Sequence, residues 1–202
     1  TTPMGAIETM MIDGAYAEIG KHLGLPVQAY MALSDSKLPD YQAGMETAMG
    51  AVIAALSGVN NVSGPGMLDF ESCQSLEKLV LDNEVCGMAL RLASGIELRD
   101  DPIVTPELMR EGIERGSFLA LAHTKRWFRE ETYFPGEVID RNALDEWQRQ
   151  GSKDSLRRAS ERVEKILASR EAEPLDAAVE EHIRGLMERE AKRHGMDALP
   201  RE

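Results

Sequence analysis

Two consecutive units of strand, polar loop and helix constrain the fold of this chain more than any other feature. In the first unit, an apolar strand over residues 27–32 leads through the polar loop 34–40 into a helix. In the second, a strand over 59–62 leads through a glycine-rich loop, 63–67, into a long helix. In α/β proteins such loops lie at the carboxyl edge of the strands, where ligands bind. The sequence therefore predicts an α/β fold in which the two loops form adjacent walls of one site.

Helices are expected around these strands because apolar residues recur at helical spacing. The helix after the first loop is rich in small residues, which permit close packing but need tertiary support. Thr105 and Pro106 are a typical N-cap and first-turn residue of a helix. The segment 117–122 is compatible with either a strand or the start of a helix. The expected helices in this part of the chain cover residues 7–23, 40–57, 71–94 and 105–115.

The last part of the chain, residues 142–202, is dense in charge and carries two apolar stripes at helical spacing. The second stripe begins after Asp176, which is expected to cap its helix. The many charged residues leave little apolar surface for a separate core. We therefore expect residues 1–141 to form the main domain and 142–202 a helical tail that packs on it or on a partner subunit.

The net charge of −12 and the cysteine content restrict the classes of partner. An acidic surface repels phosphate backbones, which argues against nucleic acid, and weakly attracts cationic small molecules. Cys73 and Cys86 lie 13 residues apart on one expected helix, too far to form a disulfide. With no signal peptide and no membrane-spanning apolar run, we expect a cytoplasmic protein without membrane contact. The chain starts with a helix and no initiator Met, so we expect the C-terminal portion of a longer protein.

Common catalytic motifs are absent from the sequence. It contains no phosphate-binding glycine motif, no HExxH or CxxC motif and no GxSxG motif. The four histidines are scattered, and none has metal-ligand spacing with another. The motifs therefore assign neither a metal site nor a catalytic residue.

The residues that can carry chemistry lie mostly in the two loops. Lys37 could pair with a substrate carboxylate and Asp35 could face a cation, or both charges could satisfy local backbone groups. The run 63–66 permits close backbone approach, which suits a large planar cofactor or a tight turn. Asn60 needs a partner if it is buried, which could be the protein or a substrate. His123 is either a structural histidine or an acid or base.

Six stretches of the chain carry a resemblance to a known family: residues 24–26, 34–44, 63–68, 77–83, 123–124 and 128–131. Taken together they resemble the trimethylamine methyltransferase family. That family includes members that lack pyrrolysine and act on quaternary amines such as glycine betaine. The similarity extends through most of the chain, although in the tail it is one of composition.

This resemblance implies a (β/α)8 TIM barrel, of which the chain covers roughly the C-terminal half, with additional C-terminal helices. It also implies methyl transfer from a methylated amine to the cobalt of a corrinoid (cobalamin) carried by a partner protein, with no cofactor bound permanently. The founding enzymes carry pyrrolysine near the segment that here spans 30–34, where no non-standard residue stands. The implied substrate is therefore a small quaternary amine. Because half a barrel exposes strand edges, a homo-oligomer is expected.

A quaternary amine explains the missing catalytic motifs, because its methyl group can be transferred without a general acid or base. The protein then only holds the cation, aligns the methyl group and excludes water. Aromatic faces and carboxylates are expected around the cation. The expected substrate-binding residues are Tyr30, Asp35, Lys37, Asn60 and His123, with Phe70 a weaker candidate. The residues expected to face the corrinoid are Ser34, Gly64, Pro65, Gly66 and Met67.

Two alternatives stay open at this point. The chain could be an incomplete barrel that retains only binding or oligomerising surfaces. It could instead perform the same chemistry on a tertiary amine or on another betaine-like compound such as carnitine.

Overall fold

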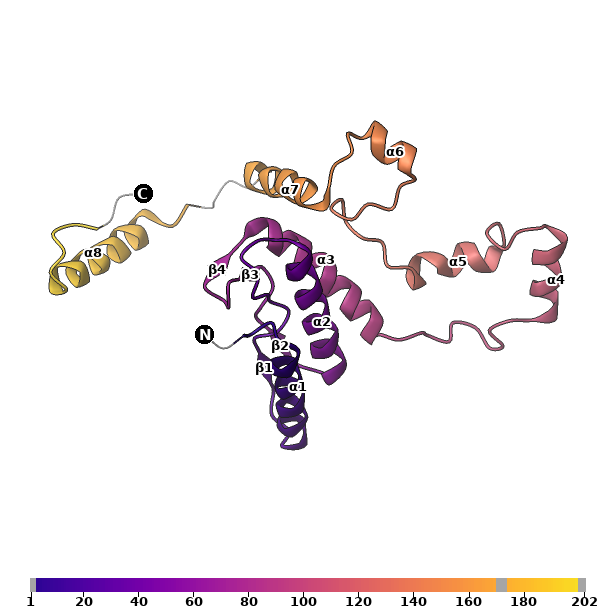
Figure 1. The fold of residues 1–202 in the computed structure, drawn as a ribbon, viewed down its shortest axis with the longest axis horizontal. Helices are drawn as coiled ribbons and strands as arrows, with labels where there is room; N and C mark the ends of the chain where they lie inside the picture. Colours follow the sequence, from indigo (N-terminus) through magenta and orange to yellow (C-terminus); the bar gives the residue numbers. More distant parts are fainter. Residues whose placement is uncertain (1–2, 170–173, 200–202) are drawn as a thin grey trace. The chain divides into compact units, whose positions relative to one another are not determined.

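The structure is a computed structural model that describes residues 3–169 and 174–199, and the chain divides into two compact units (Figure 1). The first unit is Thr1–Lys165 and the second is Ile166–Glu202. All strands of the described residues lie in the first unit, and the boundary falls within helix α7. The tail predicted for residues 142–202, packed on the main domain or on a partner subunit, stays a prediction.

Two short parallel strands form the centre of the first unit. Strand β1, Gln28–Ala29, pairs in parallel with β2, Asn61–Val62, so that Ala29 lies opposite Val62. Helix α2, Tyr41–Ser57, makes the crossover that a parallel pair requires. The strands are shorter than the predicted 27–32 and 59–62, and beyond β1 the chain adopts a left-handed conformation at Ala32, whose φ is 60°. This arrangement agrees with the predicted α/β class, whereas the barrel remains a prediction.

A β-hairpin precedes the long helix α3, Leu76–Ala93, and sequence reasoning missed it. Its strands are β3, Met67–Leu68, and β4, Cys73–Gln74, which pair antiparallel. The prediction that this helix begins near residue 71 was therefore wrong. Residues 69–71 all adopt left-handed backbone conformations, which end any helix, and the helix starts only where Ser75 caps the amide of Lys78.

Helix α2 contacts both α1, Ile7–His22, and α3, and small residues on α2 allow this close packing. A Cβ on Gly50 would lie 2.7 Å from the backbone nitrogen of Ala32, so only glycine fits there. The inward residues of α1 are Met10 and Ala17. The apolar stripe predicted for this helix lies mostly outside, at Met11, Ala15, Ile19 and Leu23.

Two of the remaining helices begin at a residue whose side chain caps the first turn. Thr105 caps the predicted helix α4, Pro106–Glu114, and Asp176 caps α8, Ala177–Arg193, in the second unit. The ambiguous segment 117–122 leads into a helix and forms no strand. The other helices are α5, Ala122–Glu131, α6, Leu144–Arg149, and α7, Ser155–Ser169. None of the helices in the described ranges combines the length and apolarity that a membrane crossing requires.

Candidate functional site

The loops that follow β1 and β2 are in direct contact with each other. The amide of Ser34 donates to the carbonyl of Met67 at 3.2 Å, and the amide of Asp69 donates to the carbonyl of Ser36 at 2.9 Å. A Cβ on Gly64 would lie 2.0 Å from the carbonyl oxygen of Met31, so the second loop runs against the end of the first strand. The parallel pairing of β1 and β2 explains this contact, because both loops leave the same edge.

Lys37 lies where the two loops meet and bridges them. Its Nζ is 3.4 Å from Oδ1 of Asp69 and 4.1 Å from the ring centroid of Phe70. The same ammonium donates to the carbonyl oxygen of Asp35 at 2.8 Å. The side chain is nevertheless 62% exposed, so the ammonium remains accessible to a ligand.

The Asp35 carboxylate holds the segment that leads into α1. Its Oδ1 accepts from the amides of Met4 and Gly5, at 3.0 and 2.9 Å. The residue is 8% exposed, which makes it one of the few buried acidic residues of the chain. The charge therefore satisfies backbone groups, although these lie 30 and 31 residues away in the sequence and not in the loop itself, as the alternative considered for Asp35 expected.

A cavity of about 440 Å³ opens beside these loops. Its volume lies in the range of small-molecule sites. Asp40 caps α2 by accepting a hydrogen bond from the Ala43 amide. This bond holds the pKa of the Asp40 carboxyl below its ordinary value, so the carboxylate stays ionised. Two carboxylates and one ammonium of the first loop, together with Phe70, therefore border a single hollow. Its lining residues are Pro3, Asp35, Ser36, Lys37, Leu38, Asp40, Gln42 and Phe70.

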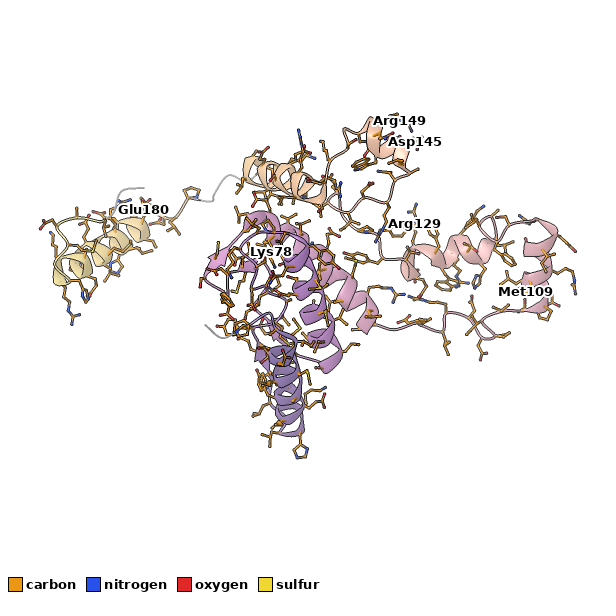
Figure 2. The ribbon with its side chains drawn as sticks, in the orientation of Figure 1. Lys78, Met109, Arg129, Asp145, Arg149 and Glu180 are labelled. Atoms are coloured by element: carbon orange, nitrogen blue, oxygen red, sulfur yellow. The ribbon has the colours of Figure 1, made fainter. Side chains whose placement is uncertain are left out.

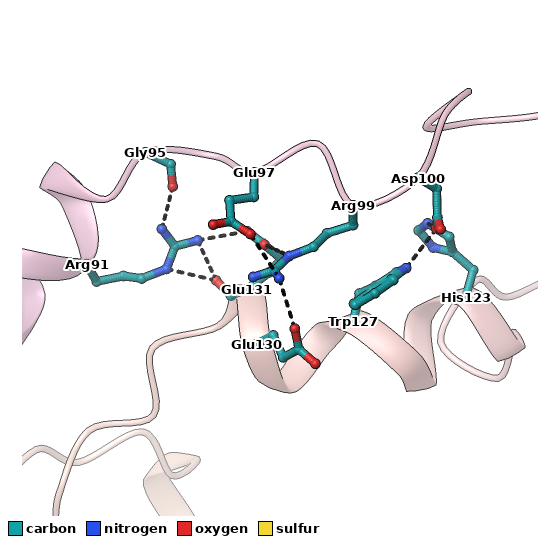
Figure 3. A network of polar contacts seen from close by, with 9 residues as sticks. All are labelled: Arg91, Gly95, Glu97, Arg99, Asp100, His123, Trp127, Glu130 and Glu131. Atoms are coloured by element: carbon teal, nitrogen blue, oxygen red, sulfur yellow. Dashed lines mark hydrogen bonds and ion pairs between the residues drawn. The ribbon is translucent and has the colours of Figure 1, made fainter.

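Three of the predicted substrate-binding residues lie apart from this cavity. Tyr30 is half-exposed just after β1, and Asn60 accepts the amide of Val27 at 2.9 Å through Oδ1. His123 lies on α5 with its Nε2 3.5 Å from Oδ2 of Asp100, which also accepts from the Trp127 indole (Figure 3). Among the described residues, none of the three lines the cavity at the loops. The structure thus brings together only Asp35 and Lys37 of that set, with Phe70.

The residues predicted to face the corrinoid differ in their exposure. Ser34, Gly64 and Gly66 are buried against the chain itself, while Pro65 and Met67 are half-buried. A Cβ on Gly66 would lie 2.1 Å from Nε2 of Gln74, and its φ of 87° favours glycine. The packing of the chain alone therefore explains why glycine is needed at positions 64 and 66.

A buried ion pair on α3 contacts the second loop, and no sequence pattern predicted it. Lys78, labelled in Figure 2, lies on α3. Its ammonium forms an ion pair with Asp82 and donates to Oγ1 of Thr47 at 2.7 Å. Asp82 also accepts the amide of Gly66 at 2.7 Å, which connects α3 to the loop. Burial raises the pKa of the Asp82 carboxyl, and the attraction of Lys78 opposes that shift. The only sequence signal was a Lys and an Asp four residues apart, a spacing that is typical of exposed helix faces.

A second missed residue, Glu46, fixes the start of the first loop. Its Oε2 accepts from the hydroxyl of Ser34 at 2.6 Å and from the amide of Asp35 at 2.9 Å. Because Glu46 lies on α2, the helix that joins the two strands also determines the shape of the loop. Within the described residues, no group of three or more histidine, cysteine or acidic side chains could hold a metal ion.

Comparisons with known proteins match this chain along nearly its whole length. The family model described as "Trimethylamine methyltransferase (MTTB)" matches residues 2–195. Trimethylamine methyltransferase MttB of Methanosarcina barkeri strain Fusaro is 32% identical over 194 residues, 95% of this chain and 38% of the relative. Glycine betaine methyltransferase of Desulfitobacterium hafniense strain Y51 is 30% identical over 193 residues, 95% of this chain and 40% of the relative. The chain thus spans about two fifths of the length of these relatives.

Proposed function

This chain belongs to the trimethylamine methyltransferase family, and from that premise we propose that it serves methyl transfer from a quaternary amine of the betaine type to a corrinoid protein. The amine class comes from two relatives, one named for trimethylamine and one for glycine betaine. The corrinoid acceptor, on a separate partner, comes from the resemblance to the family. Because the chain matches only part of each relative, its activity, substrate and partner are all part of this proposal.

One structural observation favours a betaine over trimethylamine. The cavity at the two loops is bordered by the carboxylates of Asp35 and Asp40 and by the exposed ammonium of Lys37. A betaine carries both a quaternary ammonium and a carboxylate, so its two charges complement this lining. Trimethylamine has no group that could pair with Lys37.

The chemistry of a quaternary amine agrees with the lack of common catalytic motifs in this sequence. When the bond between the methyl carbon and nitrogen breaks, the electron pair stays on nitrogen, and a neutral tertiary amine leaves. The corrinoid of the partner protein, when bound, would supply the electron pair for the new bond to the methyl carbon. The residues of this chain then have to hold the cation, orient its methyl group and exclude water. The proposed contact with the corrinoid protein falls on the half-buried Pro65 and Met67.

Methyl transfer to free cob(I)alamin, measured with glycine betaine and with trimethylamine, tests this proposal. We expect Asp35→Asn and Lys37→Met each to lower the rate with betaine by about tenfold, because the first removes a Coulomb attraction for the cation and the second a charged hydrogen bond to the carboxylate. Asn keeps an acceptor for the Met4 and Gly5 amides, so the midpoint of thermal unfolding should change little. Lys165→Met is a matched control, because Lys165 is 63% exposed and also paired with a carboxylate. Wild-type turnover in both loop variants would refute the assignment.

Self-association is a second candidate function, and the surface of α1 favours it. Met11, Ile12 and Ile19 are between 62% and 68% exposed, although each is a large apolar residue. Such a surface is typical of association with a second copy or with another polypeptide. A mass above that of one chain in light scattering, in a protein that transfers no methyl group, would favour this candidate.

We also retain a cytoplasmic location as a proposal, since Cys73 and Cys86 are both free.

A further inference from the structure

Lys37 occupies a cation site that the two loops build, and we propose that the ammonium of a betaine displaces it while Lys37 turns to the betaine carboxylate. Lys37 is then the residue that selects a betaine over a simple quaternary cation. The identity of the ligand rests on the function proposed above. The cation site itself rests on the contacts of Lys37.

Three kinds of group surround the Lys37 ammonium, and two of them also suit a quaternary ammonium. These two are the face of Phe70, whose centroid is 4.1 Å away, and the carboxylate of Asp69, at 3.4 Å. Aromatic faces attract methylated ammonium groups through the ring quadrupole, and the carboxylate adds a Coulomb attraction. The third group, the carbonyl of Asp35, accepts a hydrogen bond that only Lys37 can donate, since a quaternary ammonium has no N–H.

The backbone holds this site in place without Lys37. Asp69 and Phe70 have φ values of 49° and 55°, in the left-handed region. The Asp69 amide also donates a hydrogen bond to the carbonyl of Ser36, which connects Asp69 to the first loop. The carbonyl of Asp69 accepts from the amide of Ser72 at 2.9 Å, which closes the turn of the hairpin. Because the Lys37 side chain is 62% exposed, its departure breaks the contacts with Asp35, Asp69 and Phe70 but disturbs no buried packing of its own.

Displacement of Lys37 has different consequences for two kinds of ligand. A betaine takes the place of the ammonium on Phe70 and Asp69, and its carboxylate gives the displaced Lys37 a new partner. Tetramethylammonium takes the same place but offers Lys37 no partner. The lysine therefore competes with simple cations and assists betaines, which is a form of specificity by rejection.

Isothermal titration calorimetry of the purified protein with glycine betaine and with tetramethylammonium tests this inference. In Lys37→Met we expect the affinity for betaine to fall about tenfold and that for tetramethylammonium to rise about threefold. Asp69→Asn should weaken both ligands, because the Coulomb attraction is lost for either cation. Lys165→Met, the matched exposed lysine, should leave both affinities unchanged.

The two ligands separate this inference from the function on which it rests. If the wild type binds no betaine, the proposed function fails, yet a gain of tetramethylammonium affinity in Lys37→Met still supports the cation site. The inference is overturned if Lys37→Met lowers the affinity for both ligands alike or changes neither affinity. It is also overturned if this variant does not bind tetramethylammonium. Thermal unfolding of each variant shows that a loss of binding is not a loss of fold.

Discussion

The Lys78–Asp82 pair and the cluster around Arg99 are both built from complementary charges, but only the first is buried. The side chains of Lys78 and Asp82 are 2% and 4% exposed. Arg99, at 27%, contacts Glu97, Glu130 and Glu131 on the surface, and Glu131 also pairs with Arg91 at 2.9 Å (Figure 3). The same kind of interaction therefore operates in two very different dielectric surroundings.

The comparison shows how burial changes what an ion pair does. Water cannot readily replace a lost partner of the buried pair, whose charges are held by specific bonds, including the one that the Gly66 amide of the second loop donates to Asp82. The exposed cluster ties α5 to the segment after α3 through several carboxylates that can substitute for one another. We infer that the first fixes the position of a loop, whereas the second is a tether that salt weakens.

Removal of one partner from the buried pair should have the largest effect. Lys78→Met leaves Asp82 without its counter-charge in the core, and we expect the free energy of unfolding to fall by about 3–5 kcal/mol. Unfolding in urea, followed by circular dichroism, measures this loss. The double variant Lys78→Met, Asp82→Leu should recover about half of it, because no isolated charge remains. A single variant as stable as the wild type would show that the pair does not hold the loop.

The pH dependence of stability should differ in sign between the two regions, and Asp82 should show the larger effect. Burial raises its folded pKa above the ordinary 3.8, so just above that pH the folded state keeps a proton that the unfolded state has lost. Stability from this group is therefore lost as the pH rises through that window. In Asp82→Asn this slope should vanish from urea unfolding measured at a series of pH values. An unchanged slope would contradict the assignment.

Glu131 should show the opposite and smaller dependence. The Arg99 hydrogen bond holds the pKa of the Glu131 carboxyl below its ordinary 4.5. The stability it contributes is present above that pH and is lost as the pH falls through the lower, folded value. Glu131→Gln should remove this acid-side loss, and 1 M salt should shrink the difference between variant and wild type. A salt-independent difference would mean that the cluster acts as a buried pair.

The local elements could be predicted because their signals are local. Asp40, Thr105 and Asp176 each cap a helix through an oxygen that bonds an amide two or three residues away. The parallel pairing of the two strands followed from the helix between them. The hairpin before α3 could not be predicted, because residues 69–71 adopt left-handed conformations without a glycine among them.

The candidate site could be predicted only in part. The contact between the two loops follows from strand order, and Asp35 and Lys37 do line one cavity. The pattern gave no sign that Asp35 bonds the amides of Met4 and Gly5, some 30 residues away. It also placed His123 with the substrate, which stays a prediction; in the structure its Nε2 lies 3.5 Å from Oδ2 of Asp100.

By itself, the sequence determined where several helices begin, which loops follow the strands and which family the chain resembles, since each depends on residues close together along the chain. Only the tertiary structure decided which charges are already engaged. Lys37 reaches Asp69 and Phe70, and Lys78 is buried with Asp82, because the second loop and α3 fold against the first loop and α2. The physical reason is that the partner and the surrounding dielectric of a charged group depend on long-range packing, which a local pattern does not encode.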